Sequence, residues 1–196
     1  PVTGYSNLAK FKLDATRLLA ARAGRKYALW HCDFRNFKYI NDMYGYDVGN
    51  RLLKYWADLT AASFSPEETF ARSSADNFVL LCTYRDIAEM ETRFHNSVEL
   101  LGHFEELASK RFRVGGCYLV EDDDALSLND MLGRATMAQK SVKPLSGSRY
   151  AFYSKAMREK VIYEQEVEAS MEKALRNGEF RAWLQPQIDI RNGNRL

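Results

Sequence analysis

The chain has 196 residues, a hydrophobic fraction of 46% and a formal net charge of +2. Such a hydrophobic fraction supports a sizeable core, and the length suits one domain of typical size with an additional segment. Basic and acidic residues are interspersed, so the charge gives no support for nucleic-acid binding. No apolar run approaches the about 18 residues of a membrane span, so we expect no membrane contact by this segment.

Three cysteines lie singly in apolar runs, at Cys32, Cys82 and Cys117. This pattern predicts buried thiols in a reducing cytoplasm. The three histidines are not spaced with the cysteines as zinc ligands would be. We expect no signal peptide within this segment, and we expect it to be a piece of a longer cytoplasmic protein, in which any membrane anchor would come from an upstream region.

The first half of the chain predicts a helix capped by Asn7, an aromatic-rich strand, a second helix and a hairpin. The second half predicts an amphipathic helix, a strand, an acidic loop, a helix capped by Ser127 with Asp130, a short strand and a long charged helix. Strands that alternate with helices, together with one direct hairpin, indicate an α+β fold. The expected elements cover residues 7–22, 26–32, 48–64, 70–84, 87–107, 112–120, 127–142, 150–153 and 155–177, followed by a β-like stretch over 179–190.

Two motifs carry chemistry. The pentad Ser74-Ala75-Asp76-Asn77-Phe78 lies at the predicted hairpin tip, between two β-rich runs. About forty residues earlier, a polar run begins at Asp33 and continues to Asn50. Together these motifs resemble the GGDEF domain of diguanylate cyclases, which condense two GTP molecules into cyclic di-GMP. The resemblance spans residues 2–153 and implies a mostly antiparallel central sheet surrounded by helices, like a nucleotide-cyclase or polymerase palm.

Phosphoryl transfer requires metal-held phosphates and a placed nucleophile, and Mg²⁺ prefers carboxylate and carbonyl oxygens. The resemblance implies that the carboxylates of Asp33 and Asp76 and the carbonyl of Phe34 hold metal. The alternative is that both aspartates only shape turns, which Asp does often.

Three pentad positions depart from the family. Asn77 stands where the family has a Glu that binds metal and takes part in deprotonating the attacking hydroxyl. Asn cannot accept that proton, and losing a catalytic base typically costs about 10²–10⁴-fold in rate. Ser74 and Ala75 replace glycines, and Ala resists a positive φ. The turn is therefore either strained or of another type, and either outcome harms GTP placement.

The nucleotide contacts implied by the resemblance are partly retained. Asn41 matches a guanine-reading position, whereas Asn50 replaces an Asp, which weakens guanine selectivity. The resemblance also implies a set of phosphate contacts, although Lys and Arg side chains in loops are more often only solvated. Among these contacts, Arg149 is displaced by two extra residues in the preceding loop. Arg35 replaces a second acid and would either neutralise phosphate or pair with Asp33. The expected phosphate contacts are Asn36, Phe37, Lys38, Lys143 and Arg149.

Two further segments refine the expectation. Residues 65–68, Ser-Pro-Glu-Glu, lack the Arg of the family's inhibitory Arg-x-x-Asp motif, so we expect no tight cyclic di-GMP binding there. Residues 174–190 resemble the opening of an EAL domain, a cyclic di-GMP phosphodiesterase, without its Glu-Ala-Leu motif. The predicted organisation is a degenerate GGDEF domain over 1–153, a connecting helix over 154–178 and the start of an EAL domain over 179–196.

The resulting hypothesis is a catalytically inactive regulatory domain of a GGDEF–EAL signalling protein. The cofactor is Mg²⁺ held weakly with GTP, or none. The expected partners are GTP, the downstream EAL domain of a phosphodiesterase parent, and a second copy in a homodimer. The alternatives are a weakly active diguanylate cyclase and a structural module that binds no nucleotide.

Overall fold

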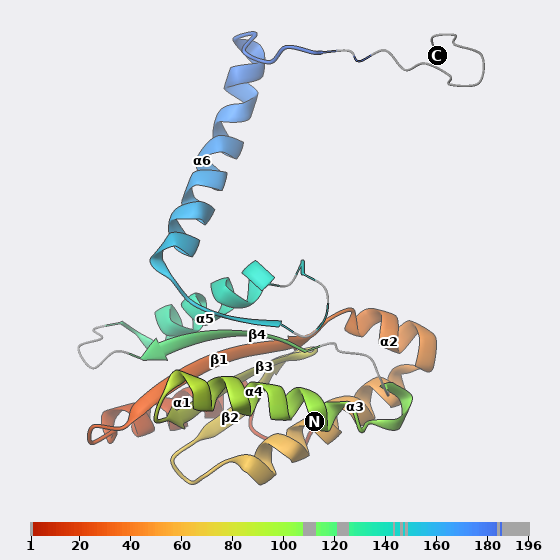
Figure 1. Cartoon of the computed structure of the whole chain (residues 1–196), viewed down its shortest axis with the longest axis vertical. Helices are drawn as coiled ribbons and strands as arrows, with labels where there is room; N and C mark the ends of the chain where they lie inside the picture. Colours follow the sequence, from red (N-terminus) through yellow and green to blue (C-terminus); the bar gives the residue numbers. More distant parts are fainter. Residues whose placement is uncertain are drawn as a thin grey trace. The chain divides into compact units, whose positions relative to one another are not determined.

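The computed structural model describes residues 2–107, 113–120, 126–142, 144, 145, 147, 149–183 and 185. The chain divides into two units, residues 1–157 and 158–196. The first unit contains a five-stranded sheet with the strand order β2-β3-β1-β4-β5 (Figure 1). The strands are β1 (Lys26–Phe34), β2 (Thr69–Ser74), β3 (Asn77–Tyr84), β4 (Arg113–Val120) and β5 (Arg149–Phe152). All neighbours pair antiparallel except β4 and β5, which are parallel, so the predicted α+β fold with a mostly antiparallel sheet is confirmed.

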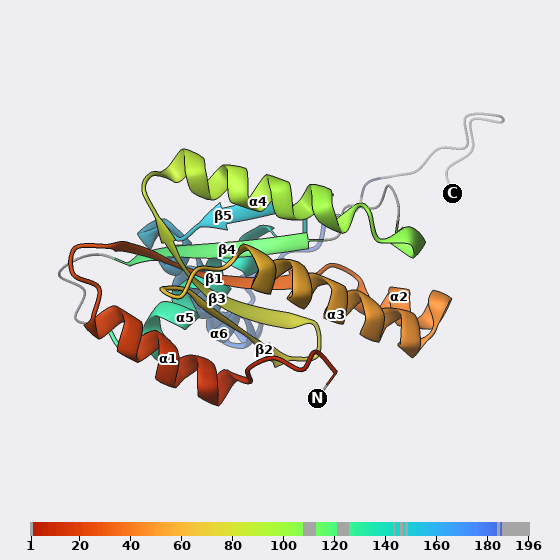
Figure 2. The same ribbon diagram turned by 90° about the horizontal axis from the view of Figure 1, so that it is seen from below.

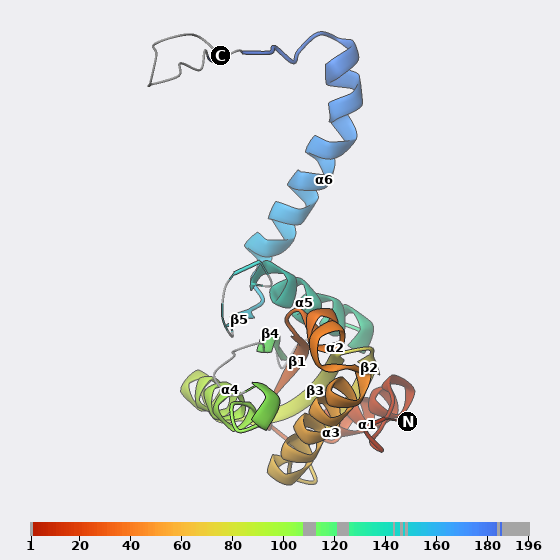
Figure 3. The same ribbon diagram turned by 90° about the vertical axis from the view of Figure 1, so that its right-hand side faces the viewer.

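Helices cover both faces of this sheet, as the end-on view in Figure 3 shows. On one face, α3 and α4 pack over Trp30 and Phe78. On the other face, α1 and α5 pack over Leu29 and Leu81. The short helix α2 follows β1 directly and leads into α3 (Figure 2). The helices of this unit are α1 (Leu8–Ala20), α2 (Phe37–Tyr44), α3 (Tyr46–Ser63), α4 (Ile87–Leu101) and α5 (Leu128–Val142), with a 3₁₀ turn at Glu105–Leu107.

A central strand buried on both faces fixes the layers. All residues of β1 from Tyr27 to Phe34 are buried except His31, which is half-buried. Gly116 of β4 lets α5 approach closely, because a Cβ there would lie 2.1 Å from the backbone of Ala135 and Gln139. Residues of strands alternate between faces, so this packing determines which side chains of β1 point toward α5.

The second unit contains most of the helix α6 (Lys155–Arg176). This helix ends at Gly178, whose φ is +71°, with the Glu179 amide donating to the Ala174 carbonyl and the Gly178 amide to the Leu175 carbonyl. That pattern is a Schellman motif, and it confirms the predicted helix end at Asn177-Gly178. No helix in the described ranges combines the length and the apolar character needed to cross a membrane.

The structure differs from the sequence predictions in four details. The helix α2 was not predicted, and α4 ends at Leu101 instead of 107 because Gly102 caps it. Asp33 lies within β1 and does not follow it. The β-like stretch expected from Glu179 has no regular structure at 179–183 and 185, and its other residues, like the acidic loop at 121–124, lie outside the described ones.

Candidate nucleotide site

The candidate site begins at the end of β1. Asp33 is only 2% exposed, and strand alternation places it on the α1 and α5 face together with Leu29. The neighbouring strand β3 pairs Phe78 with Cys32, so Asn77 lies at the next step beside Asp33 and shares its face. The substituted acid position of the pentad is therefore next to the first retained carboxylate.

The pentad forms a two-residue hairpin turn. Ser74 and Asn77 are paired, and Ala75 and Asp76 form the turn between them. Ala75 has φ +39°, in the left-handed region that an L-residue adopts only at a cost. Of the two turn conformations left open by the sequence, the structure has the strained one. Asp76 is half-buried at the tip, while Ser74 and Ala75 are exposed.

Two hydrogen bonds from β2 hold this turn. Arg72 donates from Nε to the Ala75 carbonyl at 2.5 Å, and Ser73 donates from Oγ to the Asn77 carbonyl at 3.2 Å. The register of β2 shifts between Arg72 and Ser74, so Ser73 is an extra residue of a bulge. Sequence reasoning did not identify Arg72 as a residue that holds the turn. The sequence gives little sign of this role beyond the position of Arg72 just before Ser73 and Ser74.

Phe78 anchors the other side of the pentad. It is 1% exposed, and its ring lies 4.2 Å from the Trp56 ring and 6.4 Å from the Phe34 ring, between centroids. An edge-to-face aromatic pair of this kind adds about 0.5–1.5 kcal/mol to the gain from burial. Phe78 therefore has a packing role, and it fixes the hairpin against α3.

Three of the predicted phosphate contacts, Asn36, Phe37 and Lys38, lie at the N-terminus of α2. Asn36 is the N-cap residue, in left-handed conformation with φ +55°, and its side chain makes no capping hydrogen bond. The first turn of α2 contains no acidic residue, and Lys38 is exposed there. The free amides and partial positive charge of a helix N-terminus favour an anion, and Lys38 adds to that potential. Arg35 is half-buried in the turn before Asn36.

The residues predicted for guanine recognition, Asn41 and Asn50, belong to α2 and α3. A Cβ on Gly49 would lie 1.9 Å from Oδ1 of Asn41 and 3.2 Å from the Phe37 ring. Glycine at this position therefore lets the Asn41 side chain lie against α3, next to the residue that precedes Asn50. Asn50 itself is exposed. The two residues that the sequence predicts for base recognition therefore lie on the neighbouring helices α2 and α3.

Arg149 is two strands away from Asp33 and on the same face. Val114 pairs with Asp33 on β1 and with Arg149 on β5, so the three residues form one row across the sheet. Adjacent strands are about 4.8 Å apart, which puts the backbones of Asp33 and Arg149 roughly 10 Å apart. The two extra residues before Arg149 have not removed it from this end of the sheet. Lys143, the other expected basic residue, lies outside the described residues.

The segment 65–68 has a structural role. The Glu68 side chain is 3% exposed and accepts two bonds from Arg93, at 2.7 and 3.2 Å. It also accepts from the backbone amides of Thr83 and Ser65. Burial opposes the charge of Arg93, but the hydrogen bond that Arg93 donates to Glu68 keeps the pKa of Arg93 above its usual value. The carboxylate at the end of this segment is therefore already committed within the fold.

The donor set suits one hard cation better than two. Asp33, the Phe34 carbonyl at the last residue of β1, and Asp76 offer only oxygen ligands, which Mg²⁺ prefers. Asn77 offers an amide oxygen without charge. Among the described residues, no group of three or more His, Cys, Asp or Glu side chains is placed to hold a metal. The oxygen donors of these residues are compatible with a single hard cation such as Mg²⁺.

This fold and this arrangement of strand-end Asp, hairpin pentad and helix N-terminus define a nucleotide-cyclase type of domain. The family profile "Diguanylate cyclase, GGDEF domain" matches residues 1–148. The chain belongs to the GGDEF family.

Relatives and solved structures agree with this assignment. The chain is 24% identical over 184 residues to MucR of Pseudomonas aeruginosa, a bifunctional diguanylate cyclase/cyclic di-GMP phosphodiesterase. The matched region covers 93% of this chain and 27% of MucR. It is 26% identical over 214 residues to the biofilm architecture maintenance protein MbaA of Vibrio cholerae, covering 100% of this chain and 26% of MbaA. The chain thus spans about a quarter of the length of these relatives.

The fold is that of solved GGDEF domains. The GGDEF domain of TpbB (YfiN) from Pseudomonas aeruginosa superimposes with a TM-score of 0.68 at 21% identity, over 82% of this chain and 96% of that domain. The GGDEF domain of DgcB from Caulobacter crescentus, solved in complex with c-di-GMP, gives a TM-score of 0.65 at 19% identity, over 78% and 93% of the two chains.

Proposed function

We propose that this chain is a catalytically inactive, regulatory GGDEF domain that binds GTP weakly with Mg²⁺. The observation that carries the proposal is Asn77, which lies beside the buried Asp33 on the same face of the sheet. An amide at this place can neither take the proton of an attacking hydroxyl nor supply the negative charge that a second cation needs. The strained Ala75 also adds a methyl group at a position where the family has glycine.

The retained groups support nucleotide binding. Asp33 and Asp76 offer carboxylates, the N-terminus of α2 offers amides for phosphate, and Asn41 lies against Gly49 beside Asn50. A thermal-shift series with GTP, with and without Mg²⁺, tests binding, because a ligand at 100 times its dissociation constant raises the free energy of unfolding by about 2.7 kcal/mol. We expect a small shift that requires Mg²⁺.

Matched variants assign the site. Asp33→Ala/Asp76→Ala should abolish the shift, whereas Asp42→Ala/Asp47→Ala, which removes two exposed carboxylates from α2 and α3, should keep it. An equal shift in both double variants would show that the metal site is assigned wrongly. The absence of a shift with any nucleotide would instead favour a structural module without nucleotide binding.

A second candidate function is a weak diguanylate cyclase, and the two retained aspartates favour it.

We also propose the domain organisation 1–153, 154–178 and 179–196, with the last part opening an EAL domain of a longer phosphodiesterase. The helix α6 would then connect the two domains and transmit GTP occupancy between them. Insertion of four Gly-Ser residues near Glu166 in the longer protein should remove the GTP response of hydrolysis and keep hydrolysis itself, because a flexible linker transmits no rotation. An unchanged GTP response would exclude transmission by α6.

A further inference from the structure

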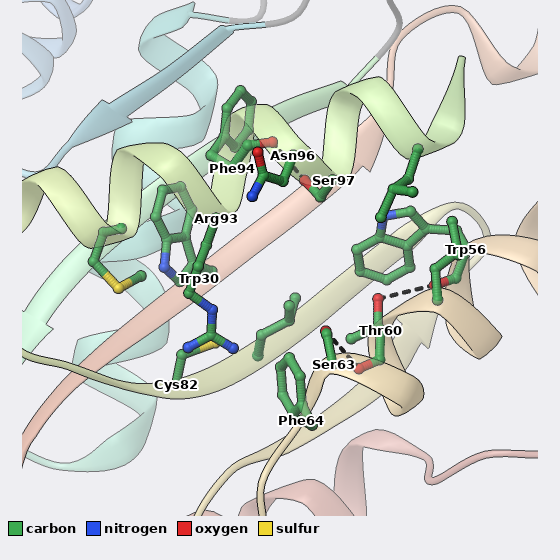
Figure 4. A pocket seen from close by; sticks show the side chains of 14 residues that line it. Trp30, Trp56, Thr60, Ser63, Phe64, Cys82, Arg93, Phe94, Asn96 and Ser97 are labelled. Carbon is green, nitrogen blue, oxygen red and sulfur yellow. Dashed lines mark hydrogen bonds between the residues drawn. The ribbon is translucent and has the colours of Figure 1, made fainter. Parts of the chain in front are cut away.

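A hollow lies on the face of the sheet opposite Asp33. It is a cavity of about 260 Å³ between α3 and α4, above β1 and β3 (Figure 4). Four aromatic side chains line it, Trp30, Trp56, Phe64 and Phe94. None of the proposed nucleotide or metal contacts lines this cavity, so it is separate from the site described above.

The size and walls indicate the ligand class. Apolar cavities of about 150 Å³ hold benzene, and pockets for small molecules begin near 300 Å³. A volume of about 260 Å³ therefore takes a molecule of one or two rings. Trp30 and Trp56 are 3% and 2% exposed, so the floor is fixed by the core, and aromatic walls of this kind favour a planar aromatic ligand.

The charge at the edge of the cavity is already balanced. Arg93 lines the cavity, but its guanidinium makes a two-bond ion pair with Glu68, at 2.7 and 3.2 Å. An anionic ligand would have to compete with this buried carboxylate, or would lie close to it. The cavity therefore favours a neutral ligand over a carboxylate or phosphate.

Three hydroxyl groups and the Asn96 amide are the uncharged polar groups that line the cavity. Thr60 and Ser63 of α3 each donate to a carbonyl of their own helix at 2.9 Å, and Ser97 of α4 donates to the Phe94 carbonyl at 2.6 Å (Figure 4). Each hydroxyl has used its one hydrogen, so its oxygen remains only as an acceptor. A ligand with an O–H or N–H donor would match these acceptors.

We propose that the cavity between α3 and α4 binds a neutral aromatic molecule with one O–H or N–H donor, of the phenol or indole class. This would be a ligand site in addition to any nucleotide site, on the other face of the sheet. Its test needs a probe that reports from inside the cavity. 4-Iodophenol is neutral at pH 7, and its iodine quenches tryptophan fluorescence at short range.

The tryptophans of this chain make the readout specific. Of its three tryptophans, Trp30 and Trp56 line the cavity, and Trp183 is 90% exposed outside it. In a Trp183→Phe background we expect saturable quenching by 4-iodophenol. 4-Iodobenzoate, which is similar in size but anionic, should bind at least tenfold more weakly. Quenching that rises linearly without saturation would overturn the proposal, and equal binding of the benzoate would overturn the neutral class.

Cavity-filling variants complete the test. Ser97→Phe fills the cavity from α4, and Thr92→Phe places the same side chain on an exposed position of α4 outside it. We expect Ser97→Phe to weaken 4-iodophenol binding at least tenfold and Thr92→Phe to leave it unchanged. Ser63→Leu fills the cavity from α3 and serves where Ser97→Phe does not fold, as judged by circular dichroism. Unchanged affinity in a folded cavity-filling variant would exclude this cavity as the site.

Discussion

Glu68 is the residue whose removal should destabilise the domain most clearly. Its side chain is 3% exposed and joins the start of β2 to α4 through Arg93. Glu68→Ala would leave Arg93 largely buried without its carboxylate, and would also leave the amides of Thr83 and Ser65 without this acceptor. Breaking a buried ion pair costs about 3–5 kcal/mol.

Partial solvation lowers this estimate. The Arg93 side chain is 29% exposed, so water recovers part of the lost interaction, and we expect a loss of about 2–3 kcal/mol. In a protein of this size 1 kcal/mol shifts Tm by about 2–4 °C, so Tm should fall by roughly 5–10 °C. Thermal unfolding followed by circular dichroism measures this directly.

The neighbouring residue is a matched control. Glu67 lies 3.8 Å from Arg25, and both side chains are nearly half exposed, at 44% and 48%. Such surface pairs contribute little, so Glu67→Ala should change the free energy of unfolding by less than about 0.5 kcal/mol. Glu68→Ala/Arg93→Met should be less destabilised than the sum of its single variants, since it leaves no lone charge. Equal effects of Glu67→Ala and Glu68→Ala would refute the reasoning.

Three further outcomes are expected. Ala75→Gly should stabilise the domain by up to about 1 kcal/mol in urea unfolding, because relief of the left-handed strain exceeds the entropy lost from the unfolded chain, whereas Ala62→Gly in α3 should destabilise it. Gly49→Ala should displace Asn41 and weaken the GTP-dependent thermal shift, and Gly133→Ala, with open space around it, should not; equal shifts in both would contradict the assignment. Burial, and then the hydrogen bond to Glu91, raise the pKa of Tyr150 to about 12. The neutral Tyr150 hydroxyl therefore stabilises the fold fully below pH 10, and this stabilisation is lost as the pH rises through 12. The ultraviolet difference between the parent and Tyr150→Phe should titrate near pH 12 and not near 10.

Local patterns predicted much of the fold. The hairpin was readable from two β-rich runs around a polar pentad, and the helix at 128–142 from a capping box, in which Ser127 and Asp130 now exchange hydrogen bonds. The end of α6 followed from Asn177-Gly178. In each case residues close in sequence decide the structure, so no long-range information is needed.

What the sequence could not predict depends on distant contacts. The ion pair of Glu68 joins residues 25 positions apart, and the row that links Arg149 to Asp33 follows from strand order. The helix α2 has only eight residues and begins after a left-handed Asn36, so its apolar pattern is too short to identify. The cavity between α3 and α4 arises from helix packing, and no sequence motif predicts it.

The candidate site was predictable only through the resemblance of its motifs. Residue types alone gave two aspartates of ambiguous role, and the structure now places Asn77 beside Asp33 and Asn41 beside Gly49. The roles of Asp33, Asp76, Asn50 and the phosphate contacts stay predictions, because binding depends on a nucleotide and a cation that bring their own charge.

The most direct test of the account is the amount of cyclic di-GMP that the purified chain makes from GTP and Mg²⁺, measured by chromatography. The account predicts none above a blank without enzyme, because Asn77 cannot replace the missing carboxylate. Turnover clearly above the blank, lost in Asp33→Ala and kept in Asp42→Ala, would show that the domain is a working cyclase and would contradict the account.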